Sequence, residues 1–471
     1  MGKYIMRVEQ ENADRASAQR AVVVGGLLLL GAILIITVLS KQFVFGLGHL
    51  KRPIISFIAI YLVAWGGYAL AVFHGNALAI NKRLFTFVVW VAILVRLLLI
   101  FSNPILENDF YRYIWDGKVL ESGRNPFHAA PAEMDIADIE PDEGRRPRAA
   151  LVHRRINYPD VKTIYPPLAQ LVFLLNASLF GWEPGGFRLT FLILDLLIMV
   201  AIYWLTGDPG RRRACFLVYA WNPLLLKETI NSMHIDIACA LFLTAYVAAV
   251  IKGRPALAFA ALLPAVFVKI TPVVLLAPLS FYLIHTRRWG RLLVYNAVFL
   301  LVALALVWTM GFGVREPFSG LLEFAHEWEM NSSLFALVQG LLKMAGVAND
   351  PAAALAKWML AGCFGTFILV SGFVVRSREQ LLHISLWALM LVFLIAPTGN
   401  PWYLTWLLPF LMVTRHPVVL ALMIVTSLYY FNFVIIDREL GNTSYTIQQW
   451  AEYLPFYLFL GWYAWWRHGA R

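Results

Sequence analysis

Long apolar runs recur along the whole chain, and no other feature constrains its fold as strongly. One of them, VVWVAILVRLLLIF, begins at Val88 and holds one charged residue, Arg96. A helix needs roughly 20 mostly apolar residues to cross a bilayer. Hydrophobic residues make up 60% of the 471 residues and charged residues only 14%, a composition typical of membrane proteins rather than soluble domains. The sequence therefore predicts an all-α polytopic membrane protein.

About fourteen runs qualify as candidate spans. They begin near Ala21, Pro53, Leu84, Phe187, Ala214, Ile235, Pro255, Pro272, Leu292, Leu355, Leu381, Pro401, Pro417 and Ala451. Two further apolar stretches, 165–180 and 332–347, are shorter than a comfortable span. We expect both to form re-entrant or interfacial helices packed against protein, where their backbone groups find hydrogen-bond partners. The three cysteines have no paired spacing, so they indicate neither a disulfide nor a metal site.

The basic residues predict the orientation, because cytoplasmic loops of membrane proteins are enriched in Lys and Arg. When the N-terminus with Lys3, Arg7, Arg15 and Arg20 lies in the cytoplasm, seven further basic clusters fall on the same side. These are 81–83, 211–213, 252–254, 286–291, 376–378, 414–416 and 466–471, while Lys41, Lys51 and Arg52 are exceptions on the first outer loop. The net charge of +11 is thus an orientation signal and not an indication of nucleic-acid binding.

This orientation divides the chain into three parts. Residues 1–102 form a cytoplasmic tail and three spans, and residues 103–186 form a large outer loop with amphipathic and re-entrant helices. Residues 187–471 form the remaining membrane bundle, with a second outer loop at 313–354. We expect a plasma (inner) membrane protein whose functional face lies in the periplasm or outside the cell.

The first outer loop opens with LENDFYRYIWDG, residues 106–117. On a helix Asp109, Arg112, Tyr113 and Asp116 form one polar stripe, so the segment is predicted to be an amphipathic helix on the outer membrane surface. Glu107 and Asp109 are two residues apart, so one of them at most points into a common site. Asp109 acting only as a helix cap is the alternative interpretation.

Other polar residues are predicted to reach the same face, each with a simpler alternative. Outer turns or helix starts carry Asn231, His234, Asp236, Lys269, Asn400, Trp402 and Tyr403, the outer loop adds Tyr165, and Arg188 begins the span that follows this loop. Lys269 could merely extend its amine to the interface, and Trp402 could belong to an aromatic belt. Asp195 lies deeper in a span, and its role stays open.

A carboxylate at the lipid–water boundary with cations and tyrosines nearby suits glycosyl transfer from a membrane-held phosphate. The carboxylate takes the proton of an acceptor hydroxyl, and the cations stabilise the departing phosphate. One base and a phosphate leaving group imply a single displacement with inversion at the sugar carbon. The sequence shows no glycine-rich loop for a soluble nucleotide and no zinc-protease motif.

Several motifs resemble the GT-C glycosyltransferases that depend on polyprenyl-phosphate sugars. They are ENDFYRYIWDGKVLESGRNPF, INYPDVKTIYPPLAQL, WNPLLLKETINSMHIDIA, FVKITP and NPWYLTWLLPFL. The chain is most similar to the bacterial mannosyltransferases and more distantly to the first mannosyltransferase of GPI-anchor assembly. This resemblance implies a GT-C-like helical bundle and transfer of a hexose such as mannose to a lipid- or glycan-linked hydroxyl. It also implies that Asp109 is the base, with Glu107 as the other candidate, that Asp236 is a second acid, and that Lys269 binds the lipid phosphate.

The resemblance implies no cofactor and no bound metal, although a divalent cation could assist. The expected partners are the prenyl-linked donor, the acceptor and the bilayer. A secondary transporter or flippase is the main alternative, but transporters usually place their charges near the membrane midplane. A subunit that binds a lipid-linked sugar without catalysis is a third possibility.

Overall fold

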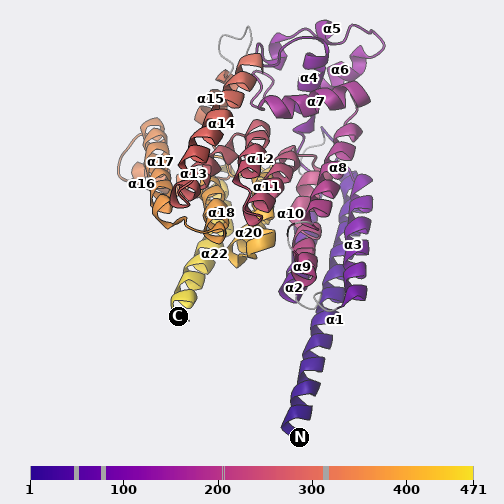
Figure 1. The fold of residues 1–471 in the computed structure, drawn as a ribbon. Helices are drawn as coiled ribbons and strands as arrows, with labels where there is room; N and C mark the ends of the chain where they lie inside the picture. Colours follow the sequence, from indigo (N-terminus) through magenta and orange to yellow (C-terminus); the bar gives the residue numbers. More distant parts are fainter. Residues whose placement is uncertain are drawn as a thin grey trace. The chain divides into compact units, whose positions relative to one another are not determined.

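The computed structural model describes residues 2–46, 52–75, 81–203, 205, 207–310 and 318–469. Within these ranges the chain is helical without a strand, apart from one isolated bridge between Met330 and Thr398 (Figure 1). The predicted all-α class is therefore confirmed. Lys51 lies outside the described residues, as do the side chains of Lys3 and Arg7 and residues 313–317 of the predicted second outer loop.

Eight helices in the described part of the chain are long and apolar enough to cross a membrane. They cover Ala13–Gln42, Ile54–Phe73, Lys82–Ile100, Gly185–Ile202, Trp289–Trp308, Asn349–Val374, Arg378–Ile395 and Pro417–Ile436. The chain is thus a multi-pass membrane protein, as predicted. The other six predicted spans fall on shorter, interrupted or more polar helices, so the number fourteen stays a prediction. The two stretches expected to be re-entrant form short helices, Pro167–Phe180 and Leu334–Met344.

The helices belong to two compact units, each assembled from separate parts of the sequence. Unit 1 comprises residues 1–106, 196–231 and 411–471, and unit 2 comprises residues 107–195 and 232–410. The boundaries of these two units therefore differ from those of the three consecutive parts that the sequence predicts. The helices α8 (Gly185–Ile202) and α19 (Leu408–Thr414) each contribute residues to both units.

Unit 1 packs its long helices closely around small residues. Its helices are α1 (Gly2–Leu39), η1 (Ser40–Gln42), α2 (Ile54–Phe73), α3 (Lys82–Ile100), α9 (Pro209–Ala220), α10 (Pro223–Leu225), the π-helical turn η5 (Leu226–Asn231), α20 (Pro417–Val425), η8 (Thr426–Phe431), α21 (Asn432–Asp437) and α22 (Gly441–Gly469). A side chain at Gly25 would meet the carbonyl oxygen of Gly67 at 2.4 Å, so glycine permits the contact of α1 with α2. The buried Arg96 donates to the carbonyl oxygens of Ala92 and Ala220, at 3.0 and 2.8 Å.

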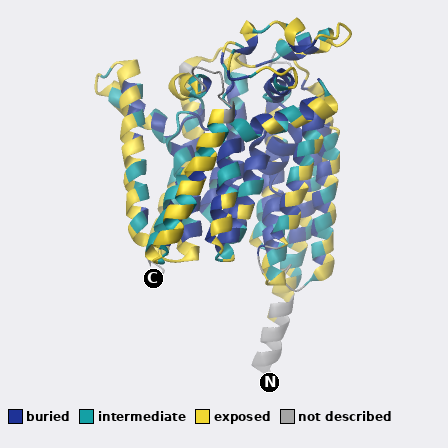
Figure 2. Cartoon of the chain, turned by 45° about the horizontal axis from the view of Figure 1, so that its top comes forward, coloured by how far each residue is buried: buried dark blue, intermediate teal, exposed yellow. Residues whose placement is uncertain are grey.

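Unit 2 holds the helices of the first outer loop and most of the second half of the chain. They are α4 (Phe110–Glu121), η4 (Pro131–Glu133), α5 (Ile136–Ile139), α6 (Arg146–His153), α7 (Pro167–Phe180), α11 (Asp236–Ile251), α12 (Pro255–Val268), η6 (Thr271–Leu275), α13 (Leu276–His285), α14 (Trp289–Met310), α15 (Ser319–Glu327), α16 (Leu334–Met344), α17 (Asn349–Val374), α18 (Arg378–Ile395) and η7 (Pro401–Leu407). Figure 2 shows that exposed residues run along some sides of the helices and over the loops, while buried residues line the packed sides.

Helix α4 is buried on all sides, and this corrects the prediction of an amphipathic helix lying on the membrane surface. Both the polar residues Arg112 and Asp116 and the apolar residues Ile114 and Trp115 are buried. Gly117 is the reason that α4 can approach α7 so closely, because an added Cβ would lie 2.3 Å from the carbonyl oxygen of Phe173. The polar stripe of α4 therefore faces protein and not solvent.

Three helices of unit 2 have one of their two ends at the polar cluster described below. α11 begins at Asp236, α12 ends just before Lys269, and α18 is followed by the segment 398–406. Their opposite ends meet at residues 251–254 and 376–378, where Arg378 donates to the carbonyl oxygen of Ile251 at 2.8 Å. The sequence thus places cationic turns at one end of these helices and the candidate functional residues at the other.

Candidate functional site

An ion pair of Lys269 and Asp236 forms the centre of the candidate site in unit 2. Asp236 is the first residue of α11 and Lys269 is the C-cap of α12, so the pairing of these two helices brings the charges together. The Lys269 Nζ lies 3.4 Å from Asp236 Oδ2, and the side chains are 14% and 1% exposed. Because removing an unpaired charge from water is unfavourable, the ion pair offsets part of the cost of burying these two groups.

Two tyrosine rings flank the Lys269 ammonium group. The Nζ lies 5.2 Å from the ring centre of Tyr165 and 5.4 Å from that of Tyr403. Tyr403 in turn stacks on Trp406 with ring centres 4.9 Å apart. Ring faces attract a cation, so the cluster fixes the ammonium group without neutralising it.

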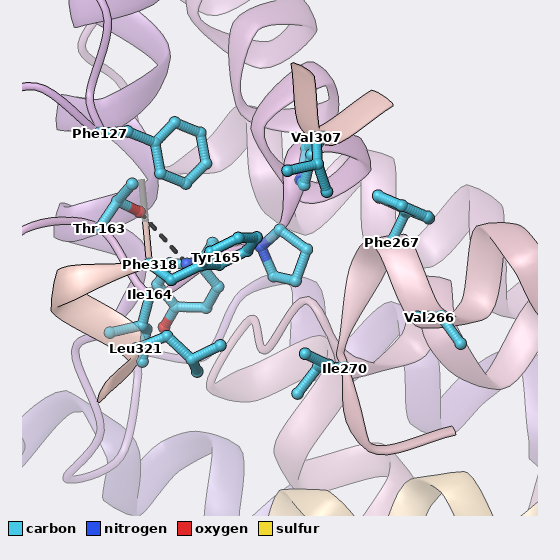
Figure 3. A pocket seen from close by; sticks show the side chains of 12 residues that line it. Phe127, Thr163, Ile164, Tyr165, Val266, Phe267, Ile270, Val307, Phe318 and Leu321 are labelled. Carbon is cyan, nitrogen blue, oxygen red and sulfur yellow. Dashed lines mark hydrogen bonds between the residues drawn. The ribbon is translucent and has the colours of Figure 1, made fainter. Parts of the chain in front are cut away.

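A cavity of about 270 Å³ opens beside this lysine, and the lysine, both tyrosines, Trp328 and Trp406 line it. A second cavity of about 150 Å³ shares Ile164, Tyr165 and Pro166 with the first and is lined almost entirely by apolar side chains. Figure 3 shows Phe127, Ile164, Tyr165, Phe267 and Leu321 around this apolar cavity. The first cavity thus combines the ammonium group of Lys269 with a mostly apolar lining, and it lies next to the second, almost entirely apolar cavity.

Asp109, immediately before α4, supplies a partly exposed carboxylate to the same cluster. Its Oδ2 lies 3.9 Å from His234 Nε2, and its side chain is 25% exposed. The His234 ring stacks on Trp402 with centres 4.1 Å apart and planes 12° apart. On the other side Asn157 donates to Asp109 Oδ1 at 3.5 Å. Asp109 is thus held between two side chains while one side remains open to solvent.

The negative charges of both acids, Asp109 and Asp236, act on one phenol, Tyr165. Burial, and then the negative charge of Asp109, raise the pKa of Tyr165 well above its usual value, with a smaller contribution in the same direction from Asp236. Tyr165 is therefore a neutral hydrogen-bonding group at any physiological pH.

The stripe residues of α4 hold the segment that carries Tyr165. Asp116 accepts hydrogen bonds from Arg112 Nε (2.8 Å), Thr163 Oγ1 (2.6 Å) and Gln170 Nε2 (3.0 Å). Arg112 also donates to the carbonyl oxygen of Val161 at 2.8 Å. These bonds fix residues 161–163, two positions before the tyrosine, so Arg112 and Asp116 act within the protein framework. Their predicted contact with substrate is untested.

Tyr113 serves the same framework through its ring. It stacks on Phe173 at 4.6 Å and meets Tyr165 edge-on at 5.1 Å, and it is fully buried. The ring therefore supports the wall of the site from behind.

Asn231, Arg188 and Asn400 are not among the residues that line the two cavities. Asn231 belongs to unit 1, where it bonds to Ser102, Asn103 and the backbone N–H of Ile105. Asn400 donates to the Tyr403 hydroxyl at 3.4 Å and so supports the aromatic wall. The buried Asp195 keeps an unassigned role.

Glu107 is the alternative to Asp109 as the reacting acid, and burial separates the two. Glu107 is 8% exposed, whereas the Asp109 side chain is 25% exposed and lies beside His234. The geometry therefore favours Asp109 as the carboxylate that a second substrate can reach.

Three residues of the site were not predicted from the sequence. Trp328 and Trp406 line the cavity beside Lys269, and Asn157 contacts the base candidate, Asp109. Asn157 and Trp406 stand inside motifs that were noted, INYPDV and NPWYLTWL. No local sequence pattern singled out Trp328.

The described residues contain no group of three His, Cys, Asp or Glu side chains arranged to hold a metal ion. Whether the protein uses a metal or a cofactor is not decided by this arrangement. That the protein uses neither a bound metal nor a cofactor stays a prediction.

Known proteins share features with this chain. The family model described as alpha-(1->6)-mannopyranosyltransferase, N-terminal domain, matches residues 16–285. Alpha-(1->6)-mannopyranosyltransferase A of Mycobacterium tuberculosis is 22% identical over 387 residues, which make up 74% of this chain and 68% of that protein. The crystal structure of ArnT from Cupriavidus metallidurans bound to undecaprenyl phosphate is 18% identical, with a TM-score of 0.45. That match covers 74% of this chain and 60% of the ArnT chain.

The family match spans more than half of the residues, so it confirms the predicted resemblance to bacterial mannosyltransferases and the predicted enzyme class, a glycosyltransferase. This chain belongs to the alpha-(1->6)-mannopyranosyltransferase family.

Proposed function

We propose that the protein transfers a single mannose, with inversion, from a polyprenyl-phosphate donor to a hydroxyl of a lipid- or glycan-linked acceptor. One observation carries this proposal: Lys269, which is paired with Asp236, lines a cavity that shares wall residues with an apolar cavity, and Asp109 lies near Tyr165 on that shared wall. A prenyl-phosphate sugar has a matching order of parts, an apolar chain, an anionic phosphate and a polar sugar. The family description favours mannose.

The lipid end of the donor fits the apolar cavity. Its lining combines aliphatic and aromatic side chains such as Phe127, Val266, Phe267 and Leu321, without a charged group among the lining residues. Isoprene units gain free energy by leaving water for such a surface. The shared wall at Tyr165 and Pro166 then directs the phosphate toward Lys269.

Lys269 binds the phosphate and stabilises the charge that develops on it. Positive charge placed at the leaving group lowers the barrier most when water is excluded, and the lysine side chain is only 14% exposed. Asp236 orients the ammonium group through the ion pair, which makes it a positioning residue. This role differs from direct proton transfer, the other role considered for this acid.

Asp109 acts as the base. It takes the proton of the acceptor hydroxyl while the acceptor oxygen bonds to the anomeric carbon and the bond from that carbon to the phosphate oxygen breaks. The bonding electrons leave with the polyprenyl phosphate, and one displacement inverts the sugar configuration. His234, held flat against Trp402, lies beside the carboxylate and fixes its orientation.

The reaction site is proposed to lie on the non-cytoplasmic side of the plasma membrane. In unit 2 the site occupies one end of α11 and α12, and the basic turn 252–254 joins their other ends. Cytoplasmic turns favour Lys and Arg, so the site faces the periplasm or exterior. Accessibility of a cysteine introduced next to the site to a membrane-impermeant thiol reagent checks this orientation.

Reconstitution tests the function. Purified protein in proteoliposomes receives polyprenyl-phosphate mannose, polyprenyl-phosphate glucose or GDP-mannose, with octyl α-D-mannoside as the acceptor. We expect transfer from polyprenyl-phosphate mannose alone, and unchanged transfer in the presence of EDTA. Transfer from GDP-mannose, or movement of the lipid donor across the bilayer without any product, would overturn the proposal.

A further inference from the structure

The segment after α6 carries an exposed tyrosine in an unusual backbone conformation. Tyr158 has φ of 53°, in the left-handed region that residues other than glycine, asparagine and aspartate seldom occupy, and its side chain is 53% exposed. Met233 and Asn331 in unit 2 also have positive φ, 59° and 52°. Met233 adjoins His234, and Asn331 lies three residues after Trp328. Non-glycine residues in this region tend to occur at functional sites, where surrounding contacts enforce them.

Contacts to the base segment enforce the conformation at Tyr158. Asn157, the preceding residue, donates to Asn108 Oδ1 at 2.5 Å and to Asp109 Oδ1 at 3.5 Å. Asn108 in turn donates to the carbonyl oxygen of Arg155 at 3.3 Å. Two residues just before Tyr158, Arg155 and Asn157, are thus bonded to Asn108 and Asp109, the two residues that precede α4. Tyr158 therefore directly follows Asn157, whose side chain contacts the proposed base, Asp109.

The same ring contacts the wall of the donor chamber. Its centre lies 4.6 Å from that of Trp328, with planes 68° apart. Trp328 lines the 270 Å³ cavity together with Lys269, and its carbonyl oxygen accepts a hydrogen bond from Thr398, another lining residue, at 3.2 Å. Tyr158 and Trp328 consequently link the base side of the site to the donor side.

We infer that Tyr158 and Trp328 form the binding subsite for the acceptor sugar. This inference rests on the proposed glycosyl transfer, in which the acceptor hydroxyl must lie between Asp109 and the donor. A hexose presents an apolar C–H face that packs on aromatic rings, and Tyr158 adds an exposed ring directly after Asn157, which contacts the partly exposed carboxylate of Asp109. The acceptor class is therefore a glycan or glycolipid whose terminal sugar packs on the Tyr158 ring. A purely apolar alcohol lacks the sugar ring that this subsite binds.

Kinetics with varied acceptor concentration test this subsite, using octyl α-D-mannoside and saturating polyprenyl-phosphate mannose. We expect Tyr158→Ala to raise the acceptor KM about threefold to tenfold, the size of one aromatic contact, with little change in kcat or in the donor KM. Tyr158→Phe and Tyr158→Trp keep the ring and should restore the acceptor KM. Trp328→Ala should raise the KM of both substrates, because Trp328 also lines the donor chamber.

Tyr203→Ala is the matched control. Tyr203 is 57% exposed and belongs to unit 1, so the substitution removes a similarly exposed ring and should leave both KM values unchanged. An unchanged acceptor KM in Tyr158→Ala, in a variant that still transfers mannose, would overturn the subsite while leaving the transferase proposal intact. An equal loss in Tyr158→Phe would also overturn it, because the hydroxyl and not the ring would then be responsible. If the wild-type protein transfers no sugar, the transferase proposal itself fails.

Discussion

Each unit of the molecule contains a buried lysine–carboxylate pair, and the two pairs differ in what surrounds them. In unit 2 Lys269 and Asp236 lie 3.4 Å apart, and Lys269 lines a cavity with 14% of its side chain exposed. In unit 1 Lys227 and Glu228 lie 3.1 Å apart, with side chains 3% and 0% exposed. The Lys227 ammonium group lies 4.4 Å from the ring centre of Tyr430, whose hydroxyl donates to Glu228.

The difference shows that access distinguishes a reactive ion pair from a structural one. Both pairs place similar charges at similar distances, so Coulomb attraction is comparable. Lys227 belongs to the π-helical turn η5, and its ammonium group lies under the ring of Tyr430. Neither side chain of the Lys227–Glu228 pair is more than 3% exposed. Lys269, in contrast, lines a cavity, through which the proposed substrate phosphate would reach it. We therefore assign binding to the pair in unit 2 and folding stability to the pair in unit 1.

The largest expected effect concerns the base beside the open pair. Asp109→Asn should lower the rate of mannose transfer by roughly 100-fold or more, the contribution of a general base, because the amide cannot take the acceptor proton. Donor binding should survive, since Lys269 and both cavities are unchanged. Asp138→Asn is the control, because Asp138 forms an exposed pair with Arg124 in the same unit. Full transfer by Asp109→Asn would move the base elsewhere in the cluster.

Lys227→Met tests the closed pair. Removing one partner leaves Glu228 as a buried charge, so the free energy of unfolding should fall by about 3–5 kcal/mol. Molecules that remain folded should bind the donor with wild-type affinity. Thermal unfolding in detergent together with donor titration measures both quantities. Loss of donor affinity in folded Lys227→Met would erase the distinction between the two pairs.

Lys269→Ala tests the open pair with the opposite expectation. A hydrogen bond to a charged group contributes about 1.5–3 kcal/mol, so the donor Kd should rise roughly tenfold to a hundredfold. The effect should disappear with a dephosphorylated polyprenol, which lacks the anion. An equal loss of affinity for both lipids would show that Lys269 acts only through packing.

The smallest effect is expected at Tyr165. Burial and the charge of Asp109 raise the pKa of this phenol well above its usual value. The phenol therefore stays protonated at the pH at which a free tyrosine ionises. Tyr165→Phe should therefore leave the alkaline limb of the pH–rate profile where it is in the wild type. A limb that vanishes in the variant would mean that Tyr165 ionises during turnover.

Much of the candidate site was predictable from the residue pattern alone. Asp109, Asp236 and Lys269 each stand next to the end of an apolar run, so topology alone brought them to one face. The burial of α4 was not predictable, because its polar stripe is equally suited to water and to an internal network of Arg112, Asp116, Thr163 and Gln170. Periodicity identifies a face of a helix but not what covers it.

The sequence by itself determined that this chain crosses a membrane many times and that its chemistry collects where helices end. Both follow from local composition, since apolar runs need lipid and charged residues avoid it. Only the tertiary structure decided which lysine lines a cavity and which is enclosed, and which side chains contact Asp109. Burial depends on residues distant in the chain, such as Tyr430 over Lys227 and Trp328 against Tyr158, and no local pattern specifies those contacts.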